Sequence, residues 1–141
     1  MTSIEIRKLG PGDDALVLAA GPLFDSAPKS DAIQRFLADP NHHLLLALAD
    51  GKPVGFVSGV ELTHPDKGTE MFLYELAVDE GHRRLGIATE LVATLRELAR
   101  KRGCYDMWVL TDHDNDAALA TYRKTGTDEE SSAVMLTWKL S

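Results

Sequence analysis

Six residues, Arg83-Arg84-Leu85-Gly86-Ile87-Ala88, have the composition of an anion-binding turn. They follow an apolar run over residues 71–78 and open an amphipathic run over residues 87–102, an order that predicts a strand, a turn and a helix. The unpaired N–H groups and the dipole at a helix start favour a phosphate, and two arginines add charged donors. Gly86 lets the backbone approach such a ligand closely. A solvated basic turn that opens an ordinary helix explains the same residues about as well.

Glu75 is a carboxylate inside the apolar run that precedes this turn, Tyr74-Glu75-Leu76-Ala77-Val78. A carboxylate among apolar neighbours is unfavourable unless it is paired or takes part in chemistry. Strand alternation predicts Glu75 and Ala77 on one face, with Tyr74, Leu76 and Val78 on the other. Glu75 is therefore a candidate functional residue, and pairing with a structural arginine is the alternative.

The last third of the chain contains a tyrosine and a concentration of acidic residues. Asn115 begins a predicted helix that carries Tyr122 two turns later. A core tyrosine with a satisfied hydroxyl is the alternative interpretation of Tyr122. Carboxylates gather around this helix, and solvated loop residues are the simpler interpretation of them: Asp112, Asp114, Asp116, Asp128, Glu129 and Glu130.

The remaining pattern predicts the elements that position these residues. Strands are expected over residues 4–9, 43–49, 54–62, 70–78, 105–111 and 133–140, and helices near residues 14–18, 30–39, 87–102 and 115–125. Asp50-Gly51 is a hairpin signal. Residues 74–111 read as a parallel strand–helix–strand unit. Without a repeat or a long linker, residues 1–141 are expected to form a single mixed α/β (α+β) domain.

Composition restricts the partners and the compartment. The net charge of −7 argues against nucleic acid as a general partner. No apolar run approaches the ~18 residues of a membrane span, and the N-terminus lacks a secretion signal, so a cytoplasmic location without membrane association is expected. Cys104 is the only cysteine, and we interpret it as structural. The histidines lack ligand spacing, so no metal is expected, although His113 in the acidic loop is a conceivable second base.

Three motifs together resemble the GNAT superfamily of N-acetyltransferases. They are Leu76-Ala77-Val78, Arg83-x-x-Gly86-x-Ala88 and Asn115-x-x-Ala118-x-x-x-Tyr122-x-x-x-Gly126. The resemblance implies an open, twisted mixed sheet of about six or seven strands with about four helices. It also implies acetyl-CoA at a splay between two parallel strands. The implied acetyl-CoA contacts are Leu76, Ala77, Val78, Arg83, Arg84, Leu85, Gly86, Ile87, Ala88, Thr89 and Asn115.

A narrower resemblance is to the GNAT-type aminoglycoside 3-N-acetyltransferases. It is carried by Lys8-Leu9-Gly10-Pro11, residues 74–78, residues 81–89 and the acidic loop of residues 112–116. Glu75 stands where that group usually has Asp. Thr125-Gly126-Thr127 replaces the usual apolar-Gly-apolar ending, which bears on the shape of the acceptor pocket.

The resemblance implies direct transfer of an acetyl group to an amine, with Glu75 as the base and Tyr122 as the acid. The expected acceptor is a polycationic aminoglycoside, which implies a role in antibiotic resistance. The residues expected to bind it are Glu75, Asp112, Asp114, Glu129 and Glu130. One alternative acceptor is another small amine, a polyamine or a protein amino group. A module that senses acetyl-CoA without transferring the acetyl group is a second alternative, although retention of Glu75 and Tyr122 argues against it. A homodimer with a contact through residues 133–140, including Trp138, is also expected.

Overall fold

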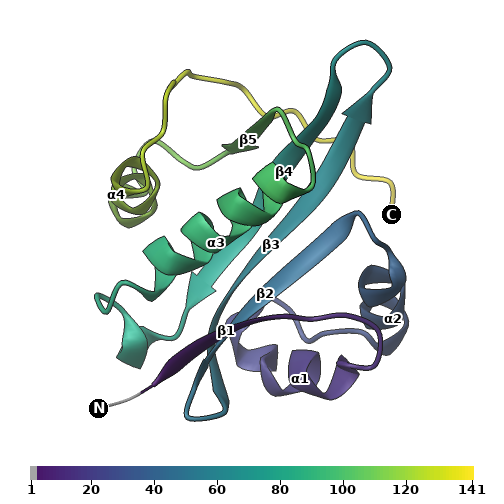
Figure 1. Cartoon of the computed structure of the whole chain (residues 1–141), viewed down its shortest axis with the longest axis vertical. Coiled ribbons are helices and arrows are strands. Elements are labelled where there is room, and N and C mark those ends of the chain that lie inside the picture. Colours follow the sequence, from purple (N-terminus) through teal and green to yellow (C-terminus); the bar gives the residue numbers. More distant parts are fainter. Residues whose placement is uncertain (1–2) are drawn as a thin grey trace.

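A computed structural model describes residues 3–141 as one open sheet with helices on both faces (Figure 1). In chain order the elements are β1 (Ile4–Lys8), α1 (Asp14–Ala19), η1 (Gly21–Leu23), α2 (Ser30–Ala38), β2 (His42–Ala49), β3 (Lys52–His64), β4 (Gly68–Val78), η2 (Glu80–His82), α3 (Ile87–Lys101), β5 (Asp106–Val109) and α4 (Asp116–Lys124). The mixed α/β fold with four α-helices is thereby confirmed. Among residues 3–141, no helix combines the length and the apolar content needed to cross a bilayer.

The sheet order is β1-β2-β3-β4-β5, and only the β4–β5 pair is parallel. Asp50 and Gly51 have φ angles of 50° and 83°, which is the left-handed geometry of the hairpin expected between β2 and β3. α3 connects β4 to β5, as a parallel pair requires. The predicted strand–helix–strand unit is therefore confirmed, although β5 is shorter than the expected 105–111.

The expected strand over residues 133–140 does not form in residues 3–141, so the sheet has five strands rather than six or seven. The segment is irregular, and its large apolar side chains are exposed. Alternating apolar residues favour a strand only when an adjacent strand supplies the hydrogen bonds. Among the strands that the structure describes in residues 3–141, none lies beside the segment.

Both faces of the sheet are covered by apolar packing. Along β2, Leu45 and Ala47 pack in the cluster that contains α3, whereas Leu44, Leu46 and Leu48 pack in the cluster that contains α1 and α2. This alternation explains why β2 reads as a continuous apolar run. Leu95 of α3 is fully buried, and a Cβ on Gly59 would lie 2.9 Å from Met71 Sδ and 3.1 Å from Leu95. Close approach at Gly59 therefore fixes α3 against β3 and β4.

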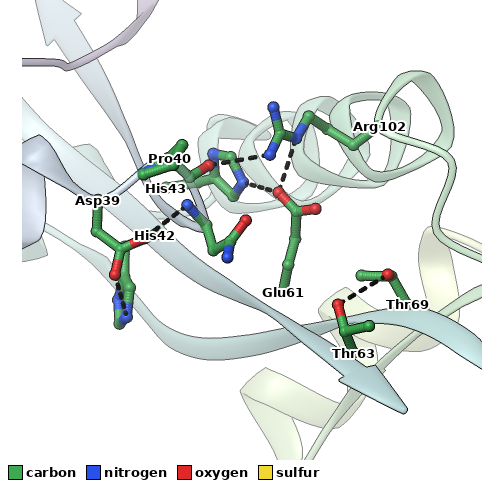
Figure 2. Close-up of polar contacts among 9 residues, drawn as sticks. Asp39, Pro40, His42, His43, Glu61, Thr63, Thr69 and Arg102 are labelled. Carbon is green, nitrogen blue, oxygen red and sulfur yellow. Dashed lines mark hydrogen bonds and ion pairs between the residues drawn. The ribbon is translucent and has the colours of Figure 1, made fainter. Parts of the chain in front are cut away.

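A buried polar cluster joins three elements away from the predicted site (Figure 2). Nε2 of His43 in β2 lies 2.6 Å from Oε2 of Glu61 in β3, and Arg102 after α3 donates to the same oxygen at 2.7 Å. Burial lowers the pKa of His43, so the neutral ring donates through Nε2. Burial alone would raise the pKa of Glu61, but hydrogen bonds from His43 and Arg102 outweigh it and hold that pKa below its ordinary value.

We expect Glu61→Ala to lower the free energy of unfolding by ~1–3 kcal/mol, because it leaves the buried His43 N–H without an acceptor. Chemical denaturation at neutral pH measures the difference. Glu97→Ala is the matched control, since Glu97 forms its one ion pair of residues 3–141 with exposed Arg100, and such pairs contribute ~0–1 kcal/mol. Equal losses in the two variants would contradict a stabilising role for the cluster.

Candidate functional site

The turn between β4 and α3 has an unusual backbone. Arg84 has a φ of 66°, and Gly86, which caps α3, has a φ of 82° in the left-handed region. No side chain of residues 3–141 caps the helix, and a Cβ built on Gly86 would meet nothing within 4 Å. The glycine is therefore required by conformation, and the space beside it is open.

The N–H groups of this turn are available to a ligand. Within residues 3–141, the backbone N–H groups of residues 84–89 donate no hydrogen bond, whereas Glu90 donates to Gly86 at 3.0 Å. Arg83 Nε donates to the carbonyl oxygen of Val78 at 3.3 Å, and neither Arg83 nor Arg84 forms an ion pair within the same residues. Free N–H groups, a helix dipole and two guanidinium groups without an ion-pair partner in residues 3–141 together fit a phosphate.

The turn follows the part of β4 that has lost its parallel neighbour. β5 ends at Val109, opposite Leu73, so residues 74–78 have β3 as their only paired strand. Their other edge therefore carries main-chain groups that no strand of residues 3–141 uses. Leu76 and Val78 pack toward α3 and Ala77 packs toward α1 and α2, as expected. The expectation for Tyr74 is wrong, since its side chain is largely exposed and Leu73 packs toward α3 instead, because the β3–β4 register shifts at this point.

Glu75 lies half-buried at this edge without an arginine partner. Its N–H donates to Ser58 Oγ at 3.2 Å, and its carboxylate forms no hydrogen bond or ion pair within residues 3–141. Burial raises the pKa of the Glu75 carboxyl, and the negative charge of Asp25 raises it further. A raised pKa suits a group that accepts a proton near neutral pH.

Asp25 is a residue that sequence reasoning missed. It lies in the loop after η1, far from Glu75 in the sequence, and its charge reaches Glu75 only because α1 and η1 pack on the same face. Loop carboxylates are common, so nothing in the local pattern distinguished Asp25 from its neighbours.

Tyr122 lies on α4, which packs beside α3 (Figure 1). The ring is half-buried against the α3 cluster, and burial raises the pKa of its phenol. The phenol therefore stays protonated at neutral pH and can donate a proton. Arg96 of α3 donates to the carbonyl oxygen of Thr125, which ties the end of α4 to α3.

Asn115 has a local structural role that the motif did not predict. Its Oδ1 accepts from the N–H of Ala118 at 3.2 Å and caps α4. The expected contact of Asn115 with a cofactor stays a prediction beside this capping role. His113 is exposed in the same loop.

The acidic residues are not gathered into one cluster. Asp112 and Asp114 are exposed in the loop before α4, and Glu130 pairs with Arg123 through two hydrogen bonds of 2.8 and 3.0 Å. Glu129 helps to raise the pKa of Asp106, which burial raises most. In the β4–β5 register, the backbone of Asp106 stands opposite Glu70. Glu70 precedes Glu75 by five residues in β4, so it lies ~16 Å from Glu75 along the strand. Glu129 therefore does not lie beside Glu75 of the same chain.

Other candidate groups are structural or scattered. Cys104 is half-buried beside the α3 cluster, and burial raises the pKa of its thiol, as expected for a structural residue. Across residues 3–141, no three or more His, Cys, Asp or Glu side chains converge in a way that could hold a metal ion.

Comparison with known sequences identifies relatives of this arrangement. Residues 14–127 match the acetyltransferase (GNAT) family. N-acetyltransferase 8 of Rattus norvegicus is 30% identical over 112 residues, which are 77% of this chain and 50% of that protein. The chain thus spans about half the length of this curated relative.

Solved structures share the fold over nearly their whole length. An aminoglycoside acetyltransferase from an uncultured soil metagenomic sample, in complex with trehalose, has a TM-score of 0.91 at 26% identity, covering 98% of this chain and 97% of that one. A second structure of the same protein is a complex with sisomicin. Another soil aminoglycoside acetyltransferase has a TM-score of 0.82 at 31% identity, covering 97% of this chain and 99% of that one.

Proposed function

The chain belongs to the acetyltransferase (GNAT) family, and from that premise we propose that it transfers the acetyl group of acetyl-CoA to an amine of an aminoglycoside. The observation that supports this most is the combination of an unpaired, half-buried Glu75 with a free strand edge that runs into a turn of free N–H groups. The proposed acetyl-CoA site and the proposed proton acceptor, Glu75, thus lie on the same strand and the turn that follows it.

The donor is proposed to lie along the free edge of β4. The N–H groups of residues 84–88 hold the pyrophosphate, with Arg83 and Arg84 supplying charge. The main chain of Leu76 and Val78 bonds the pantetheine arm and the acetyl carbonyl, since this edge has no strand partner. The same proposal includes the other expected acetyl-CoA contacts, which are Ala77, Leu85, Ile87, Thr89 and Asn115.

In the proposed mechanism, Glu75 accepts one proton and Tyr122 donates one. An ammonium has no lone pair, so Glu75 first accepts a proton from the acceptor, directly or through a water. The amine nitrogen then bonds to the acetyl carbon while the carbon–sulfur bond breaks. An N–H near Val78 stabilises the negative charge on the oxygen, and Tyr122 donates its proton to the departing thiolate. The acylated nitrogen then releases its second proton, which through water restores the Tyr122 phenol, so the products are the amide and the free thiol of CoA.

A cationic acceptor suits the charges around Glu75. Asp25, Asp112 and Asp114 are exposed carboxylates on loops that flank the end of the sheet where β4 and β5 separate. The soil acetyltransferase of similar fold was crystallised with sisomicin, an observation that favours an aminoglycoside over other amines. The 3-N position, a cytoplasmic location and a role in antibiotic resistance belong to this proposal as further predictions.

An acceptor screen tests the whole proposal. Purified protein, acetyl-CoA and a panel containing sisomicin, other aminoglycosides, polyamines and peptides are followed by thiol release and mass spectrometry of the product. The expected result is one added acetyl group on an aminoglycoside amine. Acetylation of peptides alone would contradict the aminoglycoside and identify a protein amino group as the acceptor. CoA binding without any product would favour the module that senses acetyl-CoA.

We expect Gly86→Ala to weaken CoA binding by about tenfold or more, because an L-residue at a φ of 82° carries ~1–3 kcal/mol of strain in the backbone that must face the phosphate. Titration calorimetry with CoA measures the change. Gly103→Ala is the matched control, since Gly103 has a φ of 83° and also has nothing within 4 Å of its Cβ, but lies beyond the other end of α3. Equal CoA affinity in both variants would contradict the proposed phosphate site.

A further inference from the structure

Three aromatic side chains contact one another on the face of the sheet opposite α3, and they are called here the aromatic surface: Phe72 and Tyr74 of β4 and Trp108 of β5. The Phe72 and Trp108 rings stack with their centroids 4.3 Å apart, and the Phe72 and Tyr74 rings meet edge-on at 5.8 Å and 73°. Met71 and Leu73, on either side of Phe72, pack in the α3 cluster. Strand alternation therefore places Phe72, and the rings in contact with it, on the other face.

The aromatic surface lies outside the apolar packing beneath α1 and α2. That cluster includes Ala77 from β4 and, among residues 3–141, no residue from β5. Tyr74 is 65% exposed, and Phe72 and Trp108 are partly exposed. The Trp108 Nε1 atom is buried without a hydrogen-bond partner in residues 3–141, so any side-chain surface that Trp108 exposes is carbon. Exposed apolar patches of this kind are typical of ligand-binding surfaces.

An irregularity in β4 places Tyr74 beside Glu75. In the β3–β4 register Ser58 stands opposite Glu75, and the next paired residue of β4 is Leu73, so Tyr74 is an extra residue. The main-chain N–H of Glu75 donates to Ser58 Oγ at 3.2 Å, which holds this bulge in place. A bulge re-aims a side chain, so Tyr74 and Glu75 share the face that carries Phe72 although they are neighbours in the strand.

Glu75 adjoins an acidic loop as well as the aromatic surface. Burial raises the pKa of Glu75, and the negative charge of Asp25 raises it further, so Asp25 acts on the same face. Phe24, the residue before Asp25, stacks on Phe56 of β3 at 4.4 Å and thereby fixes the start of that loop. Aromatic rings bind apolar C–H surface, whereas the carboxylates attract ammonium groups. A saturated ring that carries amines has both features.

We propose that the aromatic surface binds the sugar ring that carries the reactive amine, and that Tyr74 selects a ring over a linear amine. This inference rests on the proposed function and specifies how its acceptor is recognised. The C–H face of the sugar packs on the exposed tyrosine ring, while its ammonium groups reach Glu75 and Asp25. Phe72 covers at most one face of the Tyr74 ring, since the two rings meet edge-on, so the tyrosine keeps a face for the ligand.

Titration calorimetry at saturating CoA separates ring contact from charge, because sisomicin carries its amines on rings and spermine on a linear chain. Tyr74→Ala is expected to raise the Kd of sisomicin by about tenfold, the effect of exposing ~60 Å² of apolar surface, and the Kd of spermine by less than about threefold. Tyr74→Phe keeps the ring and should retain the wild-type Kd. Tyr105→Ala is the matched control, because Tyr105 is also exposed, at 48%, but lies at the other end of the β4–β5 pair.

The inference is overturned by absent binding of sisomicin to the wild type, by an unchanged Kd in Tyr74→Ala, or by an equal loss for spermine. Circular dichroism and CoA affinity verify the fold of the variant, and Tyr74→Thr, which keeps a strand-forming side chain, repeats the test without the ring. The acceptor screen reports separately. Ring-dependent binding without an acetylated product contradicts the proposed function alone, whereas acetylated sisomicin with an unchanged Kd contradicts this inference alone.

Discussion

Replacing Glu75 by Gln is expected to lower kcat/KM for acetyl transfer by ~10²–10⁴-fold at neutral pH, the usual contribution of a positioned base. Gln keeps the length and the polarity of Glu75 but cannot accept a proton from the ammonium group. The hydrogen bond to Ser58 Oγ comes from the main-chain N–H of residue 75, which Gln keeps, so the strand should fold unchanged. Initial rates with sisomicin and acetyl-CoA, followed by thiol release, measure the loss. An unchanged rate would remove Glu75 from the chemistry.

Two further variants show whether the proton of Glu75 matters. Glu75→Asp keeps the carboxylate and should retain more activity than Glu75→Gln. Asp25→Asn should lower the pKa of Glu75, because the negative charge that helps to raise it is removed. A base acts when deprotonated, so the acidic limb of the kcat/KM profile should then move to lower pH. Asp31→Asn, on an exposed position of α2, is the control and should leave that limb in place.

Replacing Tyr122 by Phe is expected to lower kcat by ~10²-fold or more when both substrates are saturating. Without the phenol, the sulfur must leave as an unprotonated thiolate. The ring packs in the α3 cluster, and Phe preserves that packing. Burial raises the pKa of the Tyr122 phenol above its ordinary value, so in the wild type the donor form persists through neutral and mildly alkaline pH.

Tyr105→Phe is the matched control for this experiment. Tyr105 adjoins the start of β5, at the end of the β4–β5 pair away from Val78. Partial desolvation, a hydrogen bond to Glu70 and the negative charges nearby together raise the pKa of its phenol to about 12. Tyr105 therefore shares the raised phenol pKa of Tyr122 but lies away from the proposed acetyl site, so its replacement should leave kcat unchanged. A loss of less than about threefold in Tyr122→Phe would contradict the role as proton donor. A lower stability of the variant, measured by thermal unfolding, would identify packing as the cause instead.

Local signals were sufficient for the strand–turn–helix unit and for the place of Glu75 in its strand. Gly86 and the apolar stripe of α3 lie close together in the sequence, and each favours the conformation that it adopts, whereas the left-handed backbone of Arg84 has no local signal. The same holds for the hairpin at Asp50-Gly51. These features depend on residues within a few positions of each other, so periodicity and turn chemistry predict them.

Features that depend on distant residues were not predictable in this way. The influence of Asp25 on Glu75 and the buried contact of His43 with Glu61 arise from packing between separate elements. The acidic residues were expected to act together, yet Glu130 is occupied by Arg123. Residues 133–140 alternate as a strand should, but alternation describes a strand without showing which edge it joins.

The unpaired stretch of β4 divides recognition between two kinds of chemical group. What lies along that edge meets main-chain amides, which are the same for nearly every residue type and survive most point substitutions. A molecule that approaches Glu75 contacts side chains, which a single substitution can change. Under the proposed function, substitutions around Glu75 change which amine is acetylated, while the main-chain contacts of the thioester along β4 stay the same.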